Sequence, residues 1–242
     1  METKTKKFKR DILNWYNNNK RDYSWRETND PWKILLLETI SQQTQLDRAD
    51  TYFKLFIEEF PSPATMASSS LKKVLILWSG LGYNNRARRL YESSKILSEK
   101  GFDELYPNFE VLPGVGPYTN NAILSFAYGE KVITRDVNVD RVFSRYFGLN
   151  NVENFVHNNK QPLLNRVSSR DLNQAIMDFG SMVCKSKNPL CSTCVLEKNC
   201  EKNIVKIKKS KETFSGSNRE LRGALLKLLL NENIASLETI QK

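Results

Sequence analysis

The 242-residue sequence is poor in several residue types, and each shortage excludes a class of protein. It contains one histidine, His157, so a metal site built on two histidines is excluded. It contains 10 glycines and 8 prolines, too few for a collagen-like or linker-like chain. Its longest apolar runs fall far short of the ~20 residues that span a bilayer. Because aromatic residues make up 10% of the chain, disorder is also excluded, and we expect a folded protein with no membrane partner.

Cysteine is missing from the first 183 residues, and all four cysteines then follow within one short stretch: Cys184, Cys191, Cys194 and Cys200. A disulfide framework would distribute cysteines to close loops, and the basic N-terminus lacks an apolar signal segment, so we expect reduced thiols in the cytoplasm, near the nucleoid. Four thiolates can surround zinc or an iron–sulfur cluster. Structural zinc sites more often pair two C-x2–4-C knuckles, and only one such pair occurs here, which favours a cluster.

Basic residues outnumber acidic residues by 37 to 27, which gives a formal net charge of +10 at pH 7. This excess favours a polyanionic partner, because each phosphate neutralised by Lys or Arg releases counterions and adds affinity that is independent of sequence. A lysine-rich surface exposed to solvent is the alternative interpretation, and charge alone leaves it open.

The spacing of apolar residues is helical nearly throughout, and no alternating strand pattern of useful length occurs, so we expect an all-α protein. The predicted helices cover residues 6–18, 31–45, 46–60, 71–78, 84–100, 107–111, 118–128, 136–148, 152–165, 171–183, 218–231 and 234–240. Residues 204–213 are rich in lysine and predict a linker.

Residues 112–119 form a turn rich in proline and glycine between two predicted helices. Gly114 and Gly116 permit close backbone approach and positive φ, and Pro117 suits a first helical position. Amides at a helix start favour a phosphate, which makes the turn a candidate clamp for the DNA backbone. No lysine and threonine follow as in a nucleotide-binding P-loop. A tight corner between helices without a ligand is the alternative.

Several further motifs occur in order: residues 37–45 (LETISQQTQ), 78–83 (WSGLGY), 113–118 (PGVGPY), 136–142 (DVNVDRV), 173–180 (NQAIMDFG) and the cysteine array. Together they resemble the helix-hairpin-helix DNA glycosylases of the endonuclease III superfamily, and within it the MutY-type adenine glycosylases. The resemblance runs from about residue 15 to residue 200. It implies base flipping and hydrolysis of adenine mispaired with 8-oxoguanine or guanine.

The resemblance also implies a division of the chain into two helical subdomains. Residues 24–135 would form a six-helix barrel that contains the hairpin. Residues 1–23 and 136–203 would form the second subdomain, with a four-iron four-sulfur (4Fe-4S) cluster on the four cysteines. Residues 204–242 would be a basic linker and a short helical tail, as in a short archaeal-like form without the large C-terminal domain. The implied partner is double-stranded DNA with a mismatch or an oxidised guanine, bound by a monomer.

Cleavage of an N-glycosidic bond requires stabilisation of the leaving base and of the developing sugar cation, and two carboxyl groups in different environments suffice. Glu38 lies in an apolar run, which would raise its pKa, and the resemblance implies that it is the general acid. A partly exposed helix glutamate is the alternative. Asp136 precedes a predicted helix and could be its N-cap. The resemblance implies that Asp136 stabilises the oxocarbenium ion, a compatible role, and that Asn138 holds a catalytic carboxylate.

Tyr118 stands where bifunctional relatives carry a lysine nucleophile, which forms a Schiff base and cuts the strand. The resemblance therefore implies a monofunctional enzyme that leaves an abasic site.

The resemblance also assigns contacts with DNA. Gln42, Gln43 and Thr44 match the adenine-glycosylase pattern, with Gln43 as a wedge in the duplex. Tyr83 would intercalate beside the guanine, where stacking contributes ~1–3 kcal/mol. The remaining expected contacts are Arg26 by the flipped purine, Arg86 on a phosphate, and Gly114 and Gly116 on the backbone. The alternatives are packing of Tyr83 beside Trp78, and solvated polar helix faces for Gln43 and Arg86.

Two residues depart from the adenine-glycosylase pattern. Ser41 replaces a leucine that packs near the target base, which puts base preference in question. Arg135 replaces an apolar residue, and we expect it either to lower the pKa of Asp136 or to contact a phosphate.

Three other functions stay open. Mismatch glycosylases that remove thymine or uracil opposite guanine share the Glu, Tyr and Asp positions, but tend to carry Arg-Arg in place of Gln42 and Gln43. A non-catalytic iron–sulfur DNA-binding protein would not explain Glu38 and Asp136, and an electron carrier would not need so large a basic chain.

Overall fold

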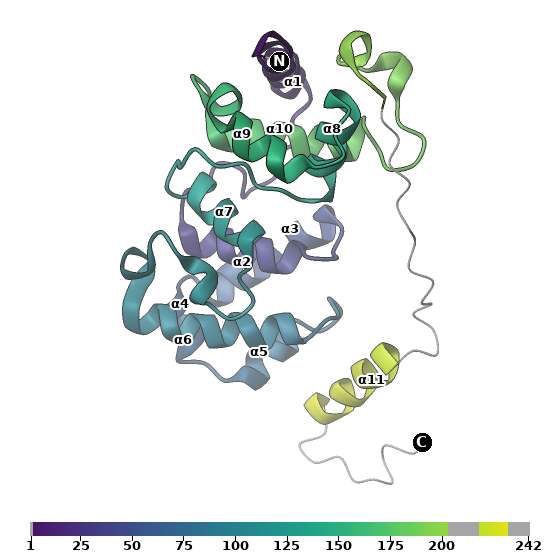
Figure 1. Cartoon of the computed structure of the whole chain (residues 1–242). Helices are drawn as coiled ribbons and strands as arrows, with labels where there is room; N and C mark the ends of the chain where they lie inside the picture. Colours follow the sequence, from purple (N-terminus) through teal and green to yellow (C-terminus); the bar gives the residue numbers. More distant parts are fainter. Residues whose placement is uncertain (1, 203–217, 232–242) are drawn as a thin grey trace. The chain divides into compact units, whose positions relative to one another are not determined.

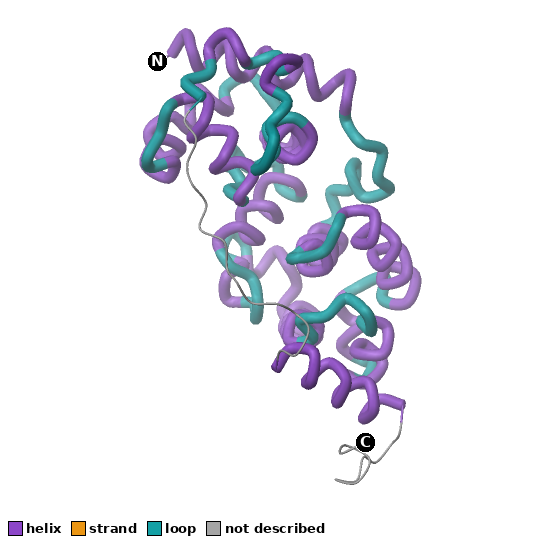
Figure 2. The backbone as a smooth tube through the Cα atoms, turned by 90° about the vertical axis from the view of Figure 1, so that its right-hand side faces the viewer, coloured by secondary structure: helices purple, strands orange, loops and turns teal. Residues whose placement is uncertain are grey.

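The computed structural model describes residues 2–202 and 218–231, and within these residues every regular element is a helix (Figures 1 and 2). None of the described helices is both long enough and apolar enough to traverse a bilayer. The α-helices are α1 (Glu2–Asn19), α2 (Pro31–Ser41), α3 (Leu46–Glu59), α4 (Pro63–Ala67), α5 (Leu71–Leu77), α6 (Asn85–Leu105), α7 (Pro117–Phe126), α8 (Val137–Phe147), α9 (Val152–Leu164), α10 (Ser169–Met182) and α11 (Asn218–Asn231). The 3₁₀ turns are η1 (Phe109–Val111), η2 (Cys191–Thr193) and η3 (Glu197–Asn199).

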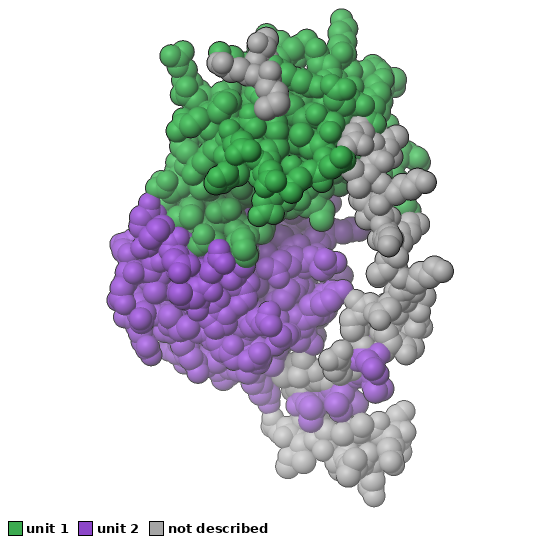
Figure 3. Space-filling view, viewed as in Figure 1, with its two compact units in different colours: residues 1–30, 117–207 green, residues 31–116, 208–242 purple. Residues whose placement is uncertain are grey.

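The chain divides into two compact units, which Figure 3 distinguishes by colour. The first unit contains α1 and α7–α10 with the cysteine loop, and the second contains α2–α6 and α11 with η1. Their boundaries fall at 30/31 and 116/117, whereas the expected subdomains have boundaries at 23/24 and 135/136. The difference arises because α7 packs against α10 and so joins the first unit. The subdomains themselves stay a prediction, and the expected linker and the helix at 234–240 lie outside the described residues.

The core of the first unit forms between α1 and α8–α10. The apolar residues of α1 recur at helical spacing, so Phe8, Ile12 and Tyr16 lie on one buried face. The ring of Phe8 lies 5.0 Å from that of Tyr146 and 5.5 Å from that of Phe143, centroid to centroid. Long-range packing of these rings therefore ties the N-terminal helix to α8.

The second unit is built around α2, which is buried from Trp32 to Ile40 apart from Lys33. A helix that is apolar on all sides must lie at the centre of its unit, and α2 packs against both α3 and α6. The indole N–H of Trp32 donates to the carbonyl of Phe60 at 3.0 Å, which also fixes the end of α3. The central position of α2 explains why its one buried acidic residue, Glu38, is far from solvent.

The helices differ from the expected ones in several places, for example in α1, which begins at Glu2 and not at residue 6. The helix predicted to reach residue 45 ends at Ser41, because Gln43 has a φ of 58°, outside the helical region. Helix α4 was not expected, although Ser62 forms a capping box with Thr65 and Pro63 opens the helix. The helix predicted to end at residue 100 continues to Leu105 after a break at Gly101, where φ is 75°.

Replacement of Phe8 by alanine is expected to lower the free energy of unfolding by about 3–5 kcal/mol, because it removes a fully buried ring from the core of the first unit. Chemical denaturation of the whole chain measures this loss. Asn17→Ala, on the exposed side of α1, is the matched control and should change stability by less than about 0.5 kcal/mol. Equal effects of the two substitutions would contradict the assigned core.

Candidate functional site

The carboxylate of Asp136 is the N-cap of α8. Its Oδ1 accepts hydrogen bonds from the backbone N–H groups of Asn138, at 2.9 Å, and Val139, at 2.7 Å. Its Oδ2 accepts from the side-chain Nδ2 of Asn138 at 2.7 Å. The N-cap interpretation is confirmed, and Asn138 contacts the carboxylate as expected. Three N–H donors hold the group in one orientation as an acceptor.

A chain of hydrogen bonds joins Asn138 to the cysteine loop. The guanidinium of Arg141 donates through Nη2 to Oδ1 of Asn138 at 2.7 Å and to the carbonyl of Gly180 at 2.6 Å. Its Nε donates to the carbonyl of Cys184 at 2.7 Å. Burial, followed by the positive charge of Arg145, lowers the pKa of Arg141. Neither Arg141 nor Arg145 was expected to have a role, although their four-residue spacing places both on one face of the predicted helix.

The cysteine loop surrounds a cavity of about 120 Å³. Apolar lining comes from Val183, Pro189 and Leu190, and Arg145 closes one side. Among the described residues, no three His, Cys, Asp or Glu side chains converge closely enough to hold a single metal ion. All four cysteines line this cavity, as the spacing predicted: Cys184, Cys191, Cys194 and Cys200.

Burial changes the acidity of the loop thiols. It raises the pKa of Cys194 to about 11, and it raises the pKa of Cys200. The Nη1 of Arg145 lies 3.5 Å from Sγ of Cys184 and donates to the carbonyl of Lys185 at 2.7 Å. The thiols of Cys194 and Cys200 therefore carry their protons at neutral pH unless a metal displaces them.

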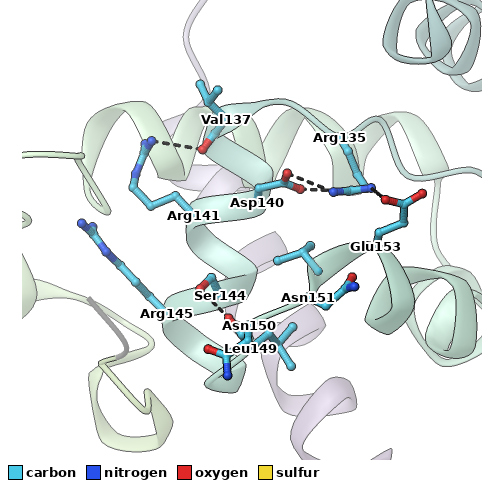
Figure 4. Close-up of a pocket in the computed structure, with 11 residues that line it drawn as sticks. Arg135, Val137, Asp140, Arg141, Ser144, Arg145, Leu149, Asn150, Asn151 and Glu153 are labelled. Atoms are coloured by element: carbon cyan, nitrogen blue, oxygen red, sulfur yellow. Dashed lines mark hydrogen bonds and ion pairs between the residues drawn. The ribbon is translucent and has the colours of Figure 1, made fainter. Parts of the chain in front are cut away.

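A cavity of about 430 Å³ is lined by residues of α8, of the turn that follows it and of the start of α9 (Figure 4). Arg135 on its rim donates to Asp140 at 2.9 Å and lies 3.5 Å from Glu153. The hydrogen bond that Arg135 donates to Asp140 is the main cause of the raised pKa of Arg135. Arg135, the residue that departs from the family pattern, is thus paired with the carboxylates of Asp140 on α8 and Glu153 on α9. A phosphate contact of Arg135 stays a prediction.

Arg26 is buried in a polar cluster inside the first unit. Its Nη2 forms an ion pair with Asp178 at 2.6 Å, and its Nη1 donates to the hydroxyl of Tyr16 at 2.8 Å and to Gln174 at 3.1 Å. Arg21 bonds to the second oxygen of Asp178 at 2.6 Å. Sequence reasoning placed Arg26 in the site but missed these three partners. The sequence does carry a signal for Gln174 and Asp178, because polar residues interrupt the otherwise apolar run 172–179 of a predicted helix.

In the second unit, Glu38 is 8% exposed on α2. Its sequence neighbours Leu36, Leu37 and Ile40 are also buried. The expected apolar surroundings are confirmed, and a partly exposed helix glutamate is excluded. Burial of a carboxyl group disfavours its charged form, which suits an acid that must hold a proton.

Two turns of the second unit present the expected DNA-inserting residues. Gln43 follows the end of α2, has a φ of 58° and is exposed. Tyr83 precedes α6, has a φ of 48° and is 48% exposed. Tyr83 is therefore not an ordinary packed residue, and Gln43 does not lie on a regular helix face, so both alternative interpretations are wrong. Thr44 bonds locally, from its hydroxyl to the carbonyl of Gln42 at 3.3 Å, and the buried hydroxyl of Ser41 has no hydrogen-bond partner in the described structure.

The guanidinium of Arg86 contacts the protein backbone and does not lie on a solvated helix face. Its guanidinium donates to main-chain carbonyls of both turns, among them Thr39 at 2.9 Å and Gly82 at 3.2 Å. The expected phosphate contact of Arg86 stays a prediction.

The hairpin turn ends the second unit. Gly114 has a φ of 86°, and a Cβ there would lie 3.1 Å from Cβ of Arg89, so glycine is required on both grounds. Gly116 has open space and no positive φ, so only part of the expectation for the two glycines is met. The hydroxyl of Ser93 donates to the carbonyl of Pro113 at 2.9 Å. In the first unit, Pro117 opens α7 and places Tyr118, half-buried, in its first turn.

Comparison with known proteins identifies relatives of this chain. The profile of the HhH-GPD superfamily base excision DNA repair proteins matches residues 37–161. The chain is 35% identical over 203 residues to an adenine DNA glycosylase of Buchnera aphidicola subsp. Baizongia pistaciae, a match that covers 80% of the chain and 58% of that relative. It is 32% identical over 234 residues to the adenine DNA glycosylase of Mycobacterium tuberculosis, over 90% of the chain and 77% of that protein. The chain thus spans less than two thirds of the first relative.

Solved structures agree on the fold. A thermostable thymine-DNA glycosylase superposes with a TM-score of 0.74 at 28% identity, over 82% of this chain and 95% of that one. A non-covalent endonuclease III–DNA complex gives a TM-score of 0.68 at 21% identity, over 84% of this chain and 96% of that one. The predicted all-α, helix-hairpin-helix fold is therefore confirmed.

Replacement of Gly180 by alanine is expected to lower the free energy of unfolding by about 1–3 kcal/mol. The added Cβ would lie 2.7 Å from Cβ of Asn138 and would separate α10 from the first turn of α8. Differential scanning calorimetry measures the change. Gly116→Ala is the control, because its Cβ meets open space, and it should be nearly neutral. Stabilisation by Gly180→Ala, as for an ordinary helix glycine, would refute the close contact.

Proposed function

We propose that this chain, which belongs to the HhH-GPD superfamily of base excision DNA repair proteins, hydrolyses the N-glycosidic bond of adenine in DNA. The observation that carries the proposal is a pair of carboxyl groups in opposite environments. Glu38 is buried in an apolar helix, whereas Asp136 is held by three N–H donors. Such a pair supplies an acid and a charged stabiliser. The adenine DNA glycosylases among the relatives support adenine as the base.

In the proposed reaction, Glu38 gives its proton to the adenine as the bond between base and sugar breaks. The carboxylate of Asp136 stabilises the positive charge that develops on the sugar. Water then adds to the anomeric carbon and releases a proton, so that free adenine and an abasic site result. Asn138 keeps the carboxylate of Asp136 in the orientation that α8 also imposes.

Tyr118 limits the proposed reaction to base release. A phenol hydroxyl cannot form the Schiff base through which a lysine cuts the strand. The proposed enzyme is therefore monofunctional, and its product strand breaks only when alkali is added.

We further propose that the mispaired partner of the adenine is guanine or 8-oxoguanine, in double-stranded DNA bound by a cytoplasmic monomer. Gln42, Gln43 and Thr44 favour adenine, and Tyr83 is exposed for stacking in the duplex. The likeness to a thymine-DNA glycosylase and the serine at position 41 support thymine or uracil opposite guanine as a second candidate.

The four cysteines are proposed to hold a 4Fe-4S cluster. Their thiols line one cavity of about 120 Å³ but do not converge on one ion, an arrangement that suits a cluster of several irons better than a single zinc. When bound, the cluster would cross-link the loop through iron–thiolate bonds. Arg145 and Arg141 would then hold the loop against α8 through the carbonyls of Cys184 and Lys185.

The activity test uses the purified chain in excess over duplexes with one central pair: A opposite 8-oxoguanine, A opposite G, T opposite G, or U opposite G. Cleavage of the adenine strand only after alkali is expected on a denaturing gel. Glu38→Gln is expected to slow base release about 10²–10⁴-fold, and Asp136→Asn about 10²–10³-fold.

Glu99→Gln, an exposed carboxyl on α6, is the control and should act as the unaltered chain. Cleavage confined to the T or U strands would replace adenine by the second candidate. A full rate with Asp136→Asn would contradict the role proposed for Asp136, and DNA binding without base release from any duplex would favour a non-catalytic DNA-binding protein.

Cluster binding is tested by metal analysis of the protein purified without oxygen. About four irons per chain are expected, and Cys194→Ser should lower both the iron content and the melting temperature. Ser192→Ala, exposed in the same loop, is the control. One zinc per chain, unchanged in iron-rich medium, would contradict the proposed cluster.

A further inference from the structure

Arg86 connects the two turns that carry Gln43 and Tyr83. It lies in the first turn of α6 and extends toward the end of α2. Its Nη1 is within hydrogen-bond distance of the carbonyls of Thr39, at 2.9 Å, Ile40, at 3.0 Å, and Gln42. These carbonyls end α2 and open the turn that contains Gln43.

The other half of the guanidinium binds the second turn. Nη2 donates to the carbonyls of Leu81, at 3.3 Å, and Gly82, at 3.2 Å, directly before Tyr83. The guanidinium carbon lies 4.9 Å from the ring centroid of Trp78 and 5.6 Å from that of Tyr83. One side chain thus makes contact with both turns and with the Tyr83 ring itself.

Both turns contain a non-glycine residue in the left-handed region, which such residues adopt only when the surroundings impose it. Gln43 has a φ of 58° and Tyr83 a φ of 48°. Residues held in this way cluster at functional sites. The donors of Arg86 bind the carbonyls on the N-terminal side of each of these two residues, where they can fix the direction in which the chain leaves the turn.

Helix α3 also supports the second turn. The hydroxyl of Tyr52 donates to the carbonyl of Ser79 at 2.6 Å, and Arg48 donates to the carbonyl of Gly80 at 2.7 Å. These bonds anchor the start of the turn from α3. Arg86 adds the link between this turn and the end of α2.

The charge of Arg86 suits this position. Burial lowers its pKa to about 10, so it remains a cation at neutral pH. It lies at the C-terminal end of α2, where the helix dipole and the free carbonyls favour a cation. A guanidinium has five N–H donors in a fixed plane, so it can bind two carbonyl groups of different orientation at once, which an ammonium cannot do equally well.

We propose that Arg86 is a positioning residue that holds the turns of Gln43 and Tyr83 together, so that the two side chains enter the duplex as one unit. The proposal rests on the proposed glycosylase function and adds a determinant of base flipping to it. It differs from a phosphate contact because the guanidinium acts on the protein backbone and not on DNA.

The first experiment examines the chain without DNA. Hydrogen exchange followed by mass spectrometry is compared for the unaltered chain, Arg86→Gln and Lys100→Ala, an exposed lysine on the same helix. Amides of residues 41–45 and 79–84 should exchange at least about tenfold faster in Arg86→Gln and unchanged in Lys100→Ala. Unchanged exchange in both segments would overturn the clamp. Arg86→Lys, which keeps the charge, replaces Arg86→Gln in every step if the latter does not fold.

The second experiment separates positioning from phosphate binding on a duplex with A opposite 8-oxoguanine. Arg86→Gln should slow base release at saturating enzyme about ten- to hundredfold. The slope of log Kd against log salt should stay that of the unaltered chain, whereas loss of a phosphate contact would reduce it by about 0.9. A reduced slope with an unchanged rate would overturn the proposal.

A mutant cycle then tests whether Arg86 acts through Gln43 and Tyr83. In a chain that already carries Gln43→Ala and Tyr83→Ala, Arg86→Gln should slow base release by less than about twofold further. If Arg86→Gln slowed base release by the same factor in this chain as in the unaltered chain, the proposal would be overturned. An unaltered chain that releases no base from any duplex would overturn the proposed function and with it this role, while the exchange result would still decide the clamp.

Discussion

Arginine side chains that bind main-chain carbonyl groups hold the loops on which the rest of the site depends. Arg86 binds the ends of two turns in the second unit, and Arg141 and Arg145 bind the cysteine loop in the first. Arg170 likewise donates to the carbonyls of Arg26 and Phe126. An all-α chain has no sheet edges to pair with its loops, so buried loop carbonyls need donors from side chains. Five N–H donors in one plane make arginine the efficient choice.

This use of arginine changes the meaning of the chain's positive charge. The net charge of +10 was interpreted as either a footprint for a polyanion or a solvated surface. Arg26 and Arg145 belong to neither group, because both are at most 8% exposed and both donate to acceptors within the protein. Part of the charge therefore serves the architecture, and only the exposed lysines and arginines are available to the DNA of the proposed function.

The two carboxyl groups show how helices prepare chemistry without special loops. Asp136 is an N-cap, so the same N–H groups that begin α8 also orient the carboxylate. Glu38 is buried because α2 lies at the centre of its unit. The environment of Asp136 comes from α8 itself, whereas that of Glu38 depends on the helices packed around α2. The cysteine loop is connected to the first of them through Arg141 and Asn138.

The sequence alone determined the helical class, most helix positions, the N-cap at Asp136 and the burial of Glu38, because spacing and capping are local properties of the chain. It also brought the four cysteines to one cavity, since they are close in sequence. It did not reveal the early end of α2, the inward direction of Arg86, or the partners of Arg26 and Arg135. Those depend on contacts between residues far apart in the chain, such as Arg26 with Asp178 and Arg86 with Thr39. Only tertiary packing decides which carbonyls and carboxylates a long guanidinium side chain reaches, because its flexible stem allows many directions until its neighbours are fixed.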